Sequence, residues 1–474
     1  MAECCIPIRY LVSLMVFFAF VLDQALRSCL SITVLVMVNR THGAQPLFHG
    51  PVTHMKFFES ARYPQNRTSL GDPRNWNTTT QGWVLNSVYI GILFSQLPAG
   101  HLVESFSLKW VLGYGVFFMS LLQFVSPLVI SWSVWAFVAL RIVAGLCIGS
   151  AFPSANALMS RWSPVHERTL LITLATLGYG VGATVTMFIA GPLCKHFGWA
   201  SVFYFFGACG VIWSLLWYVC VASSPEKHRW ISEEERVMTL ANRDGNFDQN
   251  RHIPWKAILT SGPTMVFCIR TFCSMVFGTI FSTYTPIFLD HMYNIDLTVN
   301  GWINGISNML SAIVALICSI VADRLLQSGY SINKVRKTFS TLSLMLPASI
   351  MLLLAQLEAD VRLVAGLIIF ASTLWGLYGG SDPALPIDLT AEFSGAVSAV
   401  VNTYANLAAV LTPIIVGWFL ADQENFFRWN VIFETGAFTA MLGAGIFLVL
   451  GSASRQNWPT SSEDEAAPLL VDPL

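Results

Sequence analysis

Long apolar runs alternate with short polar stretches along the whole chain. A helix that crosses a bilayer needs about 20 mostly apolar residues, and roughly twelve runs meet that length. The pattern therefore predicts an all-α membrane protein. The first run is longer than the apolar core of a signal peptide, and no small-residue cleavage pattern follows it, so we expect a membrane helix there. The predicted spans are 10–38, 82–103, 110–130, 133–159, 169–191, 200–222, 262–289, 300–322, 339–356, 362–388, 394–420 and 428–451.

The polar loop at 39–80 predicts how the chain is oriented. It contains three sequons for N-glycosylation, at Asn39, Asn66 and Asn77. Three sequons in one polar loop place that loop in the lumen or outside the cell. Asn39 lies too near the first span to be a safe acceptor, whereas Asn66 and Asn77 lie well clear of both flanking spans. The amino terminus is then expected in the cytosol.

Basic residues support the same orientation. Counting spans from a cytosolic amino terminus places 223–261 and 323–338 in the cytosol, and both segments are rich in Lys and Arg. Such an excess is typical of cytosolic loops. The loop at 39–80 is also basic, but long loops translocate largely regardless of charge.

A weak internal repeat predicts two halves. Gly100–Glu104 with Lys109 follows the second span, and Ser319–Asp323 with Arg324 follows the eighth. Two halves of six helices explain this recurrence of a small residue and an acid. We expect the small residues to let helices approach and the acid and base to pair at the cytosolic ends. The expected divisions are an amino-terminal half at 1–222, a cytosolic linker at 223–261, a carboxy-terminal half at 262–452 and a cytosolic tail at 453–474.

Composition excludes several other classes of protein. Of the 474 residues, 54% are hydrophobic and only 11% are charged, whereas a soluble domain carries roughly 25% charged residues. The net charge of −1 offers no basic face to a nucleic acid. The cysteines show no metal-ligand spacing, and no nucleophile–base set is visible. We therefore expect no enzyme activity, no metal site and no cofactor.

Eight segments carry a family resemblance: Ala25–Arg27 with Leu30-Ser31, Thr80–Trp83, Ser95–Gly100, Arg141 with Gly145, Phe152-Pro153, Arg161–Arg168, Phe203–Gly207 and Asn402–Ala405. The chain resembles the anion:cation symporter family of the major facilitator superfamily. It is nearest to the sialin branch, with the vesicular glutamate and phosphate transporters more distant. The resemblance covers nearly the whole chain and is strongest in the amino half. It implies a major facilitator fold of about twelve helices.

Two arginines lie deep within predicted spans. Arg27 is about eleven residues from the luminal end of span one, and Arg141 about eight from that of span four, roughly 16 Å and 12 Å along the helices. Such a charge costs about 2.5–3.5 kcal/mol to insert, so it usually faces a cavity or a partner. The resemblance implies that both arginines bind the substrate carboxylate, a task that suits the planar guanidinium fork. The alternative is a structural ion pair or a snorkelling side chain.

The chain departs from the family pattern at three positions. Ile148 stands where the resemblance implies a glutamate that takes part in proton coupling. Leu85 replaces a span-two histidine of the vesicular glutamate branch, as in the sialin branch, and Ser274 replaces a span-seven arginine of that branch. Arg270 lies one turn before Ser274, where it either contacts the substrate, acts as a gate or snorkels towards the cytosol.

Two carboxylates are candidates for proton coupling. Asp23 shares a helix face with Arg27, so a substrate that engages Arg27 would free Asp23 to take a proton; the alternative is a permanent salt bridge. Asp382 lies beside Pro383 and Pro386, where we expect a broken helix, although a polar cytosolic cap is the simpler interpretation. Aromatic side chains that either line the cavity or merely pack are Tyr89, Tyr179, Tyr284, Trp375 and Tyr404.

The tail carries a candidate sorting signal. Glu465 precedes Leu469 and Leu470 in the pattern of an acidic dileucine signal, which a clathrin adaptor binds through the acid and the two leucines. The surrounding tail is polar and is expected to be extended. The pattern predicts a lysosomal or vesicular membrane, with the plasma membrane as the alternative.

These features predict a secondary transporter of organic anions, such as an acidic sugar or an acidic amino acid. Its two halves would rock around a central site and expose that site to each side of the membrane in turn. A proton or sodium gradient or the membrane potential would drive this movement. The expected partners are the anion, the coupling ion, the lipid bilayer and the adaptor. Two alternatives stay open: an inorganic phosphate or urate carrier or facilitator of the same family, and a transporter-like receptor that does not transport, which Ile148 favours.

Overall fold

The chain is helical throughout the part that the computed structural model describes, namely residues 7–37, 76, 78–241, 253–293, 295, 297–356, 360–420, 426–456 and 458, and no strand occurs there. Eleven candidate spans in this part are long and apolar enough to cross a membrane. The 28-residue helix α2 has the length of a twelfth. Each predicted span coincides with helix, so the all-α membrane fold is confirmed. Asn39, Asn66, Asn77 and the tail signal at 465–470 lie outside the described residues.

Seven helices, α1 to α7, form what we call the amino half. Two of them, α4 and α5, continue one another across a two-residue turn and together make one candidate span. The bounds are α1 (Ile8–Met37), α2 (Thr78–Ser105), α3 (Leu108–Trp132), α4 (Val134–Ile148), α5 (Ala151–Trp162), α6 (Arg168–Phe197) and α7 (Trp199–Cys220), with a 3₁₀ turn at Val165–Glu167 before α6. A second 3₁₀ turn (Pro225–Lys227), α8 (Glu233–Ala241) and α9 (Trp255–Thr260) follow.

Helices α10 to α17 form the carboxy half, in which two spans are interrupted. A π-helical turn at Ile280–Tyr284 separates α10 (Gly262–Thr279) from α11 (Thr285–Tyr293). A 3₁₀ turn at Gly376–Gly380 and a short turn separate α14 (Val361–Trp375) from α15 (Leu385–Leu389). The second break confirms the expectation from Pro383 and Pro386, since proline cannot donate to a helical hydrogen bond. The other helices are α12 (Leu297–Gln327), α13 (Ile332–Gln356), α16 (Ser394–Leu420) and α17 (Phe426–Leu450).

Glycines allow the closest helix crossings in the amino half. A Cβ atom on Gly178 of α6 would lie 2.0 Å from the carbonyl oxygen of Phe17 in α1. Gly91 of α2 and Gly145 of α4 meet in the same way, each with the partner's backbone 2.1 Å from the position of its missing Cβ. Small residues commonly mediate helix contacts in membranes because lipid supplies no hydrophobic drive for helix association.

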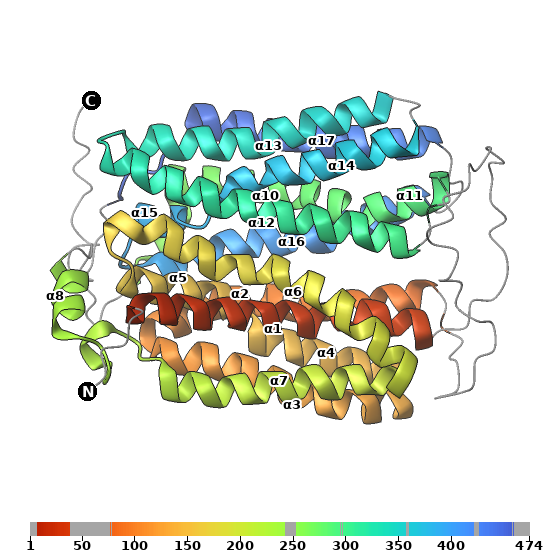
Figure 1. The fold of residues 1–474 in the computed structure, drawn as a ribbon, viewed down its shortest axis with the longest axis horizontal. Helices are drawn as coiled ribbons and strands as arrows, with labels where there is room; N and C mark the ends of the chain where they lie inside the picture. Colours follow the sequence, from red (N-terminus) through yellow and green to blue (C-terminus); the bar gives the residue numbers. More distant parts are fainter. Residues whose placement is uncertain are drawn as a thin grey trace.

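The helices of both halves run along the long axis of the molecule, and the two halves lie next to each other across it (Figure 1). The amino half, red to yellow-green, forms one layer, and the carboxy half, green to blue, forms the other. Helix α8, the start of α1 and the end of α17 share one end of the bundle. We call this the cytosolic end, following the orientation expected from the sequons and basic loops.

Candidate functional site

Asp23 and Arg27 form a buried ion pair in the middle of α1. Arg27 Nε donates to Asp23 Oδ1 at 2.6 Å, and Arg27 Nη2 donates to Oδ2 at 2.5 Å. The aspartate is fully buried, and the arginine is 6% exposed. The guanidinium also lies 5.8 Å from the ring centre of Tyr179 on α6. Asp23 and Arg27 therefore share one helix face, as predicted. The Arg27 guanidinium, which was expected to bind a substrate carboxylate, already binds the carboxylate of Asp23.

Arg141 reaches the same level of α1 from α4. Its Nη1 and Nη2 each donate at 3.1 Å, to the backbone carbonyls of Leu26 and Arg27 respectively. Gln123 of α3 adds a hydrogen bond of 2.6 Å from its Nε2 to the Leu26 carbonyl. Arg141 is 1% exposed, and its Nε has no hydrogen-bond partner among the described residues. No carboxylate of this part of the chain pairs with Arg141.

The amino half therefore encloses more positive than negative charge at this level. Asp23 balances Arg27, and Arg141 is left with neutral acceptors. Tyr89 of α2 lies close to both guanidinium groups. A buried cation without a counter-ion is costly in a membrane, so the arrangement favours a bound anion.

The carboxy half holds a second buried pair. Arg270 of α10 donates through Nη1 to Asp382, which lies in the break between α14 and α15. Its Nη2 also donates to the hydroxyl of Ser343 at 3.3 Å. Arg270 is 2% exposed, and the Asp382 side chain is 19% exposed. The interpretation of Asp382 as a polar cytosolic cap is wrong, because the break turns its carboxylate inward to Arg270.

The candidate aromatic residues are scattered. Tyr179 lies beside Arg27, whereas the Tyr284 hydroxyl donates to the Pro413 carbonyl at 3.3 Å. Tyr404 packs against the apolar cluster at the start of α16. Trp375 packs in the carboxy-half core, with its ring 5.4 Å from that of Phe277. Of the aromatic residues predicted to line the cavity, Tyr89 and Tyr179 adjoin the buried arginines.

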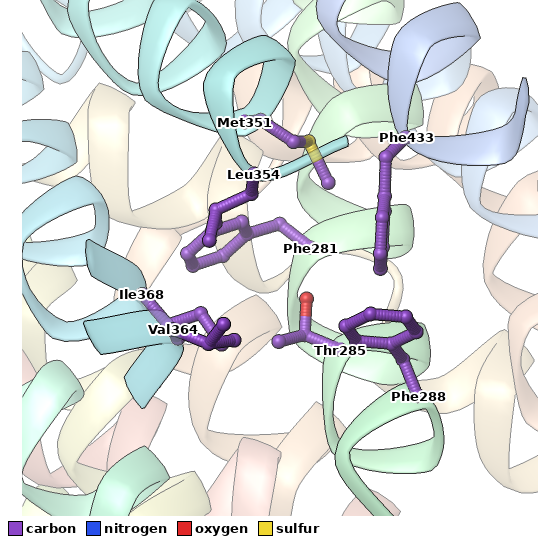
Figure 2. Close-up of a pocket in the computed structure, with 8 residues that line it drawn as sticks. All are labelled: Phe281, Thr285, Phe288, Met351, Leu354, Val364, Ile368 and Phe433. Carbon is purple, nitrogen blue, oxygen red and sulfur yellow. The ribbon is translucent and has the colours of Figure 1, made fainter. Parts of the chain in front are cut away.

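An apolar pocket in the carboxy half is separate from these charges. It lies between α11, α13, α14, α17 and the π-helical turn, and the Thr285 hydroxyl is its one polar side-chain group (Figure 2). None of the buried arginines lines it. Such a pocket cannot neutralise an anion, so we do not assign the substrate site to it. Its lining residues are Phe281, Thr285, Phe288, Met351, Leu354, Val364, Ile368 and Phe433.

A charged clamp joins the two halves at the cytosolic end. Asp388 of α15 accepts from Arg168 of α6 at 3.4 Å and from Arg336 of α13 at 2.7 Å. Arg336 also donates to the hydroxyl of Thr169 at 2.9 Å. Asn156 of α5 donates to Ser398 Oγ of α16 at 3.0 Å. The clamp residues are buried, so the halves are closed against each other at this end.

The two repeat acids lie at helix amino termini of the opposite half, and Asp323 binds one of them through hydrogen bonds. Asp323 accepts from the backbone amides of Thr169 and Leu170, at 3.2 and 2.9 Å, where α6 begins. Glu104 lies against the backbone of Gly395 at the start of α16. Carboxylates are favourable there because of the free amides and the helix dipole. The expected acid–base pairing is wrong for Lys109, which donates instead to the Tyr218 carbonyl at 2.6 Å.

Sequence reasoning missed the clamp itself. Arg336 counted only as one basic residue of a cytosolic loop, yet it is 1% exposed and contacts both halves. Its place at the start of a span beside a loop gives no signal of burial. Within the described residues, no group of three or more His, Cys, Asp or Glu could hold a metal ion.

Comparisons with known proteins agree with this architecture. Residues 16–413 match the Major Facilitator Superfamily. Human sialin is 27% identical over 467 residues, covering 96% of this chain and 92% of sialin. Rabbit sodium-dependent phosphate transport protein 1 is 25% identical over 464 residues, covering 96% of each chain. The solved structure of the proton:xylose symporter XylE superposes with a TM-score of 0.64 at 16% identity, covering 94% of this chain and 96% of that one.

The extent of these matches confirms the expected resemblance and the expected absence of enzyme activity, since the relatives are transporters. Because the superfamily match covers most of the chain, its family is established. The chain belongs to the Major Facilitator Superfamily and is a multi-pass membrane transporter related to sialin and to the phosphate transporters.

Proposed function

We propose that the chain transports small organic anions, such as acidic sugars or acidic amino acids, by alternating access of its two halves. The observation that carries this proposal is the state of Arg141, a buried cation whose hydrogen bonds to the described residues go only to neutral carbonyl groups. A carboxylate substrate would supply the missing negative charge. This imbalance supports the predicted role of Arg141 in substrate binding, whereas Arg27 would bind the substrate only by releasing Asp23.

Binding of the anion would rearrange the hydrogen bonds at α1. The carboxylate would compete with Asp23 for Arg27 and with two α1 carbonyls for Arg141. Asp23 would then lose its partner in a buried site and favour the protonated form. This exchange couples anion binding to proton binding without the glutamate that Ile148 replaces. Arg270 and Asp382 offer a similar exchange in the carboxy half.

Inorganic phosphate is the second candidate substrate. The same excess of buried positive charge would bind phosphate, and a rabbit relative over the full length is a sodium-dependent phosphate transport protein. A sodium-driven cycle would need no protonation of Asp23. Uptake that a proton gradient accelerates would support the Asp23 exchange, whereas uptake that depends only on a sodium gradient would not.

The test is uptake by purified protein in liposomes, under imposed proton or sodium gradients, with a labelled acidic sugar, acidic amino acid, phosphate or urate. Arg141→Ala should reduce anion uptake by about ten- to a hundredfold, because a charge-assisted hydrogen bond contributes roughly 1.5–3 kcal/mol. Arg141→Lys should recover little, since it restores charge without the planar fork.

Gln123→Met is the matched control. It removes a hydrogen bond to the same Leu26 carbonyl but changes no charge, so it should retain most of the uptake. Equal losses in Gln123→Met and Arg141→Ala would mean that α1 packing, not anion binding, explains the effect. Wild-type uptake in Arg141→Ala would refute the proposed site, and no uptake of any anion by the wild type would favour the receptor alternative.

The lysosomal or vesicular location is also a proposal, supported by the dileucine pattern and by the relationship to sialin. Leu469→Ala with Leu470→Ala should move the protein to the plasma membrane, because adaptor capture needs the leucines. Surface biotinylation of cells that express the two forms measures this shift. Unchanged intracellular retention would remove the reason for assigning a vesicular location.

A further inference from the structure

The segment that follows α17 crosses the cytosolic end instead of leaving the bundle. We call Ser452–Gln456 with Trp458 the strap. Near its start, the Ala453 amide donates to Asn333 Oδ1 at 2.5 Å, and Asn333 Nδ2 donates to Ser454 Oγ at 2.6 Å. Asn333 lies in the first turn of α13, so the strap is tied to the carboxy half at this point.

The rest of the strap binds the turn between α15 and α16. The Gln456 amide donates to the Leu389 carbonyl at 2.8 Å. Arg455 approaches Glu392 at 3.6 Å, and the Trp458 ring packs against a buried cluster that includes Phe393. Leu389 is fully buried, so its carbonyl depends on this bond from the strap.

The helices that flank the same turn carry contacts of the clamp between the halves. Asp388, one residue before Leu389, accepts from Arg168 of the amino half. Gly395, two residues after Phe393, lies against Glu104 of α2. Ser398 accepts from Asn156 of α5. The strap therefore contacts the turn, and the helices on either side of the turn in the chain contact the amino half.

The polar contacts of the strap within the described residues are all to the carboxy half. Loss of the strap would thus break none of the hydrogen bonds or ion pairs that join the described parts of the two halves. Any change in opening at the cytosolic end would have to act through the position of the α15–α16 turn. This separation makes the role of the strap testable.

We propose that the strap is a positioning element of the cytosolic clamp: by fixing the α15–α16 turn, it holds Asp388, Gly395 and Ser398 in register with the amino half and so limits opening to the cytosol. The backbone bond from Gln456 to Leu389 and the side-chain bonds of Asn333 perform this task. The inference rests on the proposed alternating access, but its readout is conformational and does not depend on which anion is carried.

A cysteine at residue 398 reports the opening. Ser398 is fully buried between the halves, so in Ser398→Cys a membrane-impermeant maleimide added from the cytosolic side should react only when the clamp opens. Labelling is measured in permeabilised cells and counted on the peptide that contains residue 398, so native cysteines do not contribute. In this background, Asp388→Asn weakens the clamp directly and serves as the positive control for labelling.

Gln456→Pro and Gln456→Ala form the first matched pair. Proline removes the amide that donates to Leu389, whereas alanine keeps it. We expect Gln456→Pro to raise the labelling rate severalfold and Gln456→Ala to leave it unchanged. Equal labelling rates in the two variants would overturn the proposal.

Asn333→Ala and Asn333→Asp form a second pair that leaves the strap's own sequence intact. Aspartate keeps the acceptor for the Ala453 amide and suits the first turn of a helix, whereas alanine loses both bonds. Labelling should rise in Asn333→Ala and return close to the parent rate in Asn333→Asp. Unchanged labelling in Asn333→Ala at normal expression would also overturn the proposal. If the parent protein carried no anion but these labelling differences held, the transport proposal alone would fail.

Discussion

Three buried arginines differ in how their charge is balanced. Arg27 and Arg270 each have an aspartate, whereas Arg141 has backbone carbonyls. The first pair was predictable, because a spacing of four residues places two side chains on one helix face. The partners of Arg141 were not predictable. They are backbone carbonyls, which every residue has, so the sequence does not identify the ones that accept from the guanidinium. The identity of the charged residues was thus predictable, but their partners across helices were not.

At this scale, Asp23→Asn separates two roles of the α1 pair. If Asp23 carries the coupled proton, the variant should still exchange anion across a liposome membrane but lose acceleration by an inward proton gradient. If Asp23 only balances Arg27, expression should fall, since a buried charge would lose its partner. Exchange and gradient-driven uptake, measured on the same liposomes, distinguish these outcomes. Coupling that survives in well-expressed Asp23→Asn would exclude Asp23 as the proton carrier.

The helices themselves were predictable, with ends that differ from the predicted ones by up to seven residues, but their interruptions were predictable only in part. Pro383 and Pro386 predicted the break before α15, and this break places Asp382 next to Arg270. The π-helical turn at Ile280–Tyr284 has no such signal, because its residues are ordinary apolar and hydroxyl side chains. A helix break caused by proline can be predicted from the local sequence, whereas a π turn depends on packing against other helices.

A glycine pair on α6 tests the close packing of helices. Gly178 faces the Phe17 carbonyl at a distance that leaves no room for a Cβ atom, whereas a Cβ on Gly180 would meet nothing within 4 Å. Gly178→Ala should therefore lower the apparent Tm of the detergent-solubilised protein, because overpacking costs about 1–3 kcal/mol. Gly180→Ala should leave Tm unchanged or raise it, since alanine is the better helix former. Equal Tm values would show that α1 moves away without cost.

At the scale of the whole molecule, the clamp and the orientation of the chain in the membrane together determine the side to which the anion site can open. Asp388, Arg336 and the two repeat acids join the halves at the end that holds α8. If this end is cytosolic, the structure is closed to the cytosol, and the anion site would load from the lumen or exterior. The direction of loading therefore depends on the topology that the sequons predict.

Glycosylation of Asn66 and Asn77 decides that topology. Both asparagines lie in the expected luminal loop, so both should carry glycans in cells that glycosylate secretory proteins. Asn66 is the stronger acceptor, because it lies well clear of α1 and α2, whereas Asn77 directly precedes Thr78, where α2 begins. Glycosidase treatment should increase the mobility of the wild type on a gel, and the Asn66→Gln, Asn77→Gln double variant should no longer shift. A residual shift in the double variant would assign a glycan to Asn39 and keep the loop luminal. An unshifted wild type would place the loop in the cytosol, reverse the assignment of the clamped end, and make the structure one that is closed to the lumen.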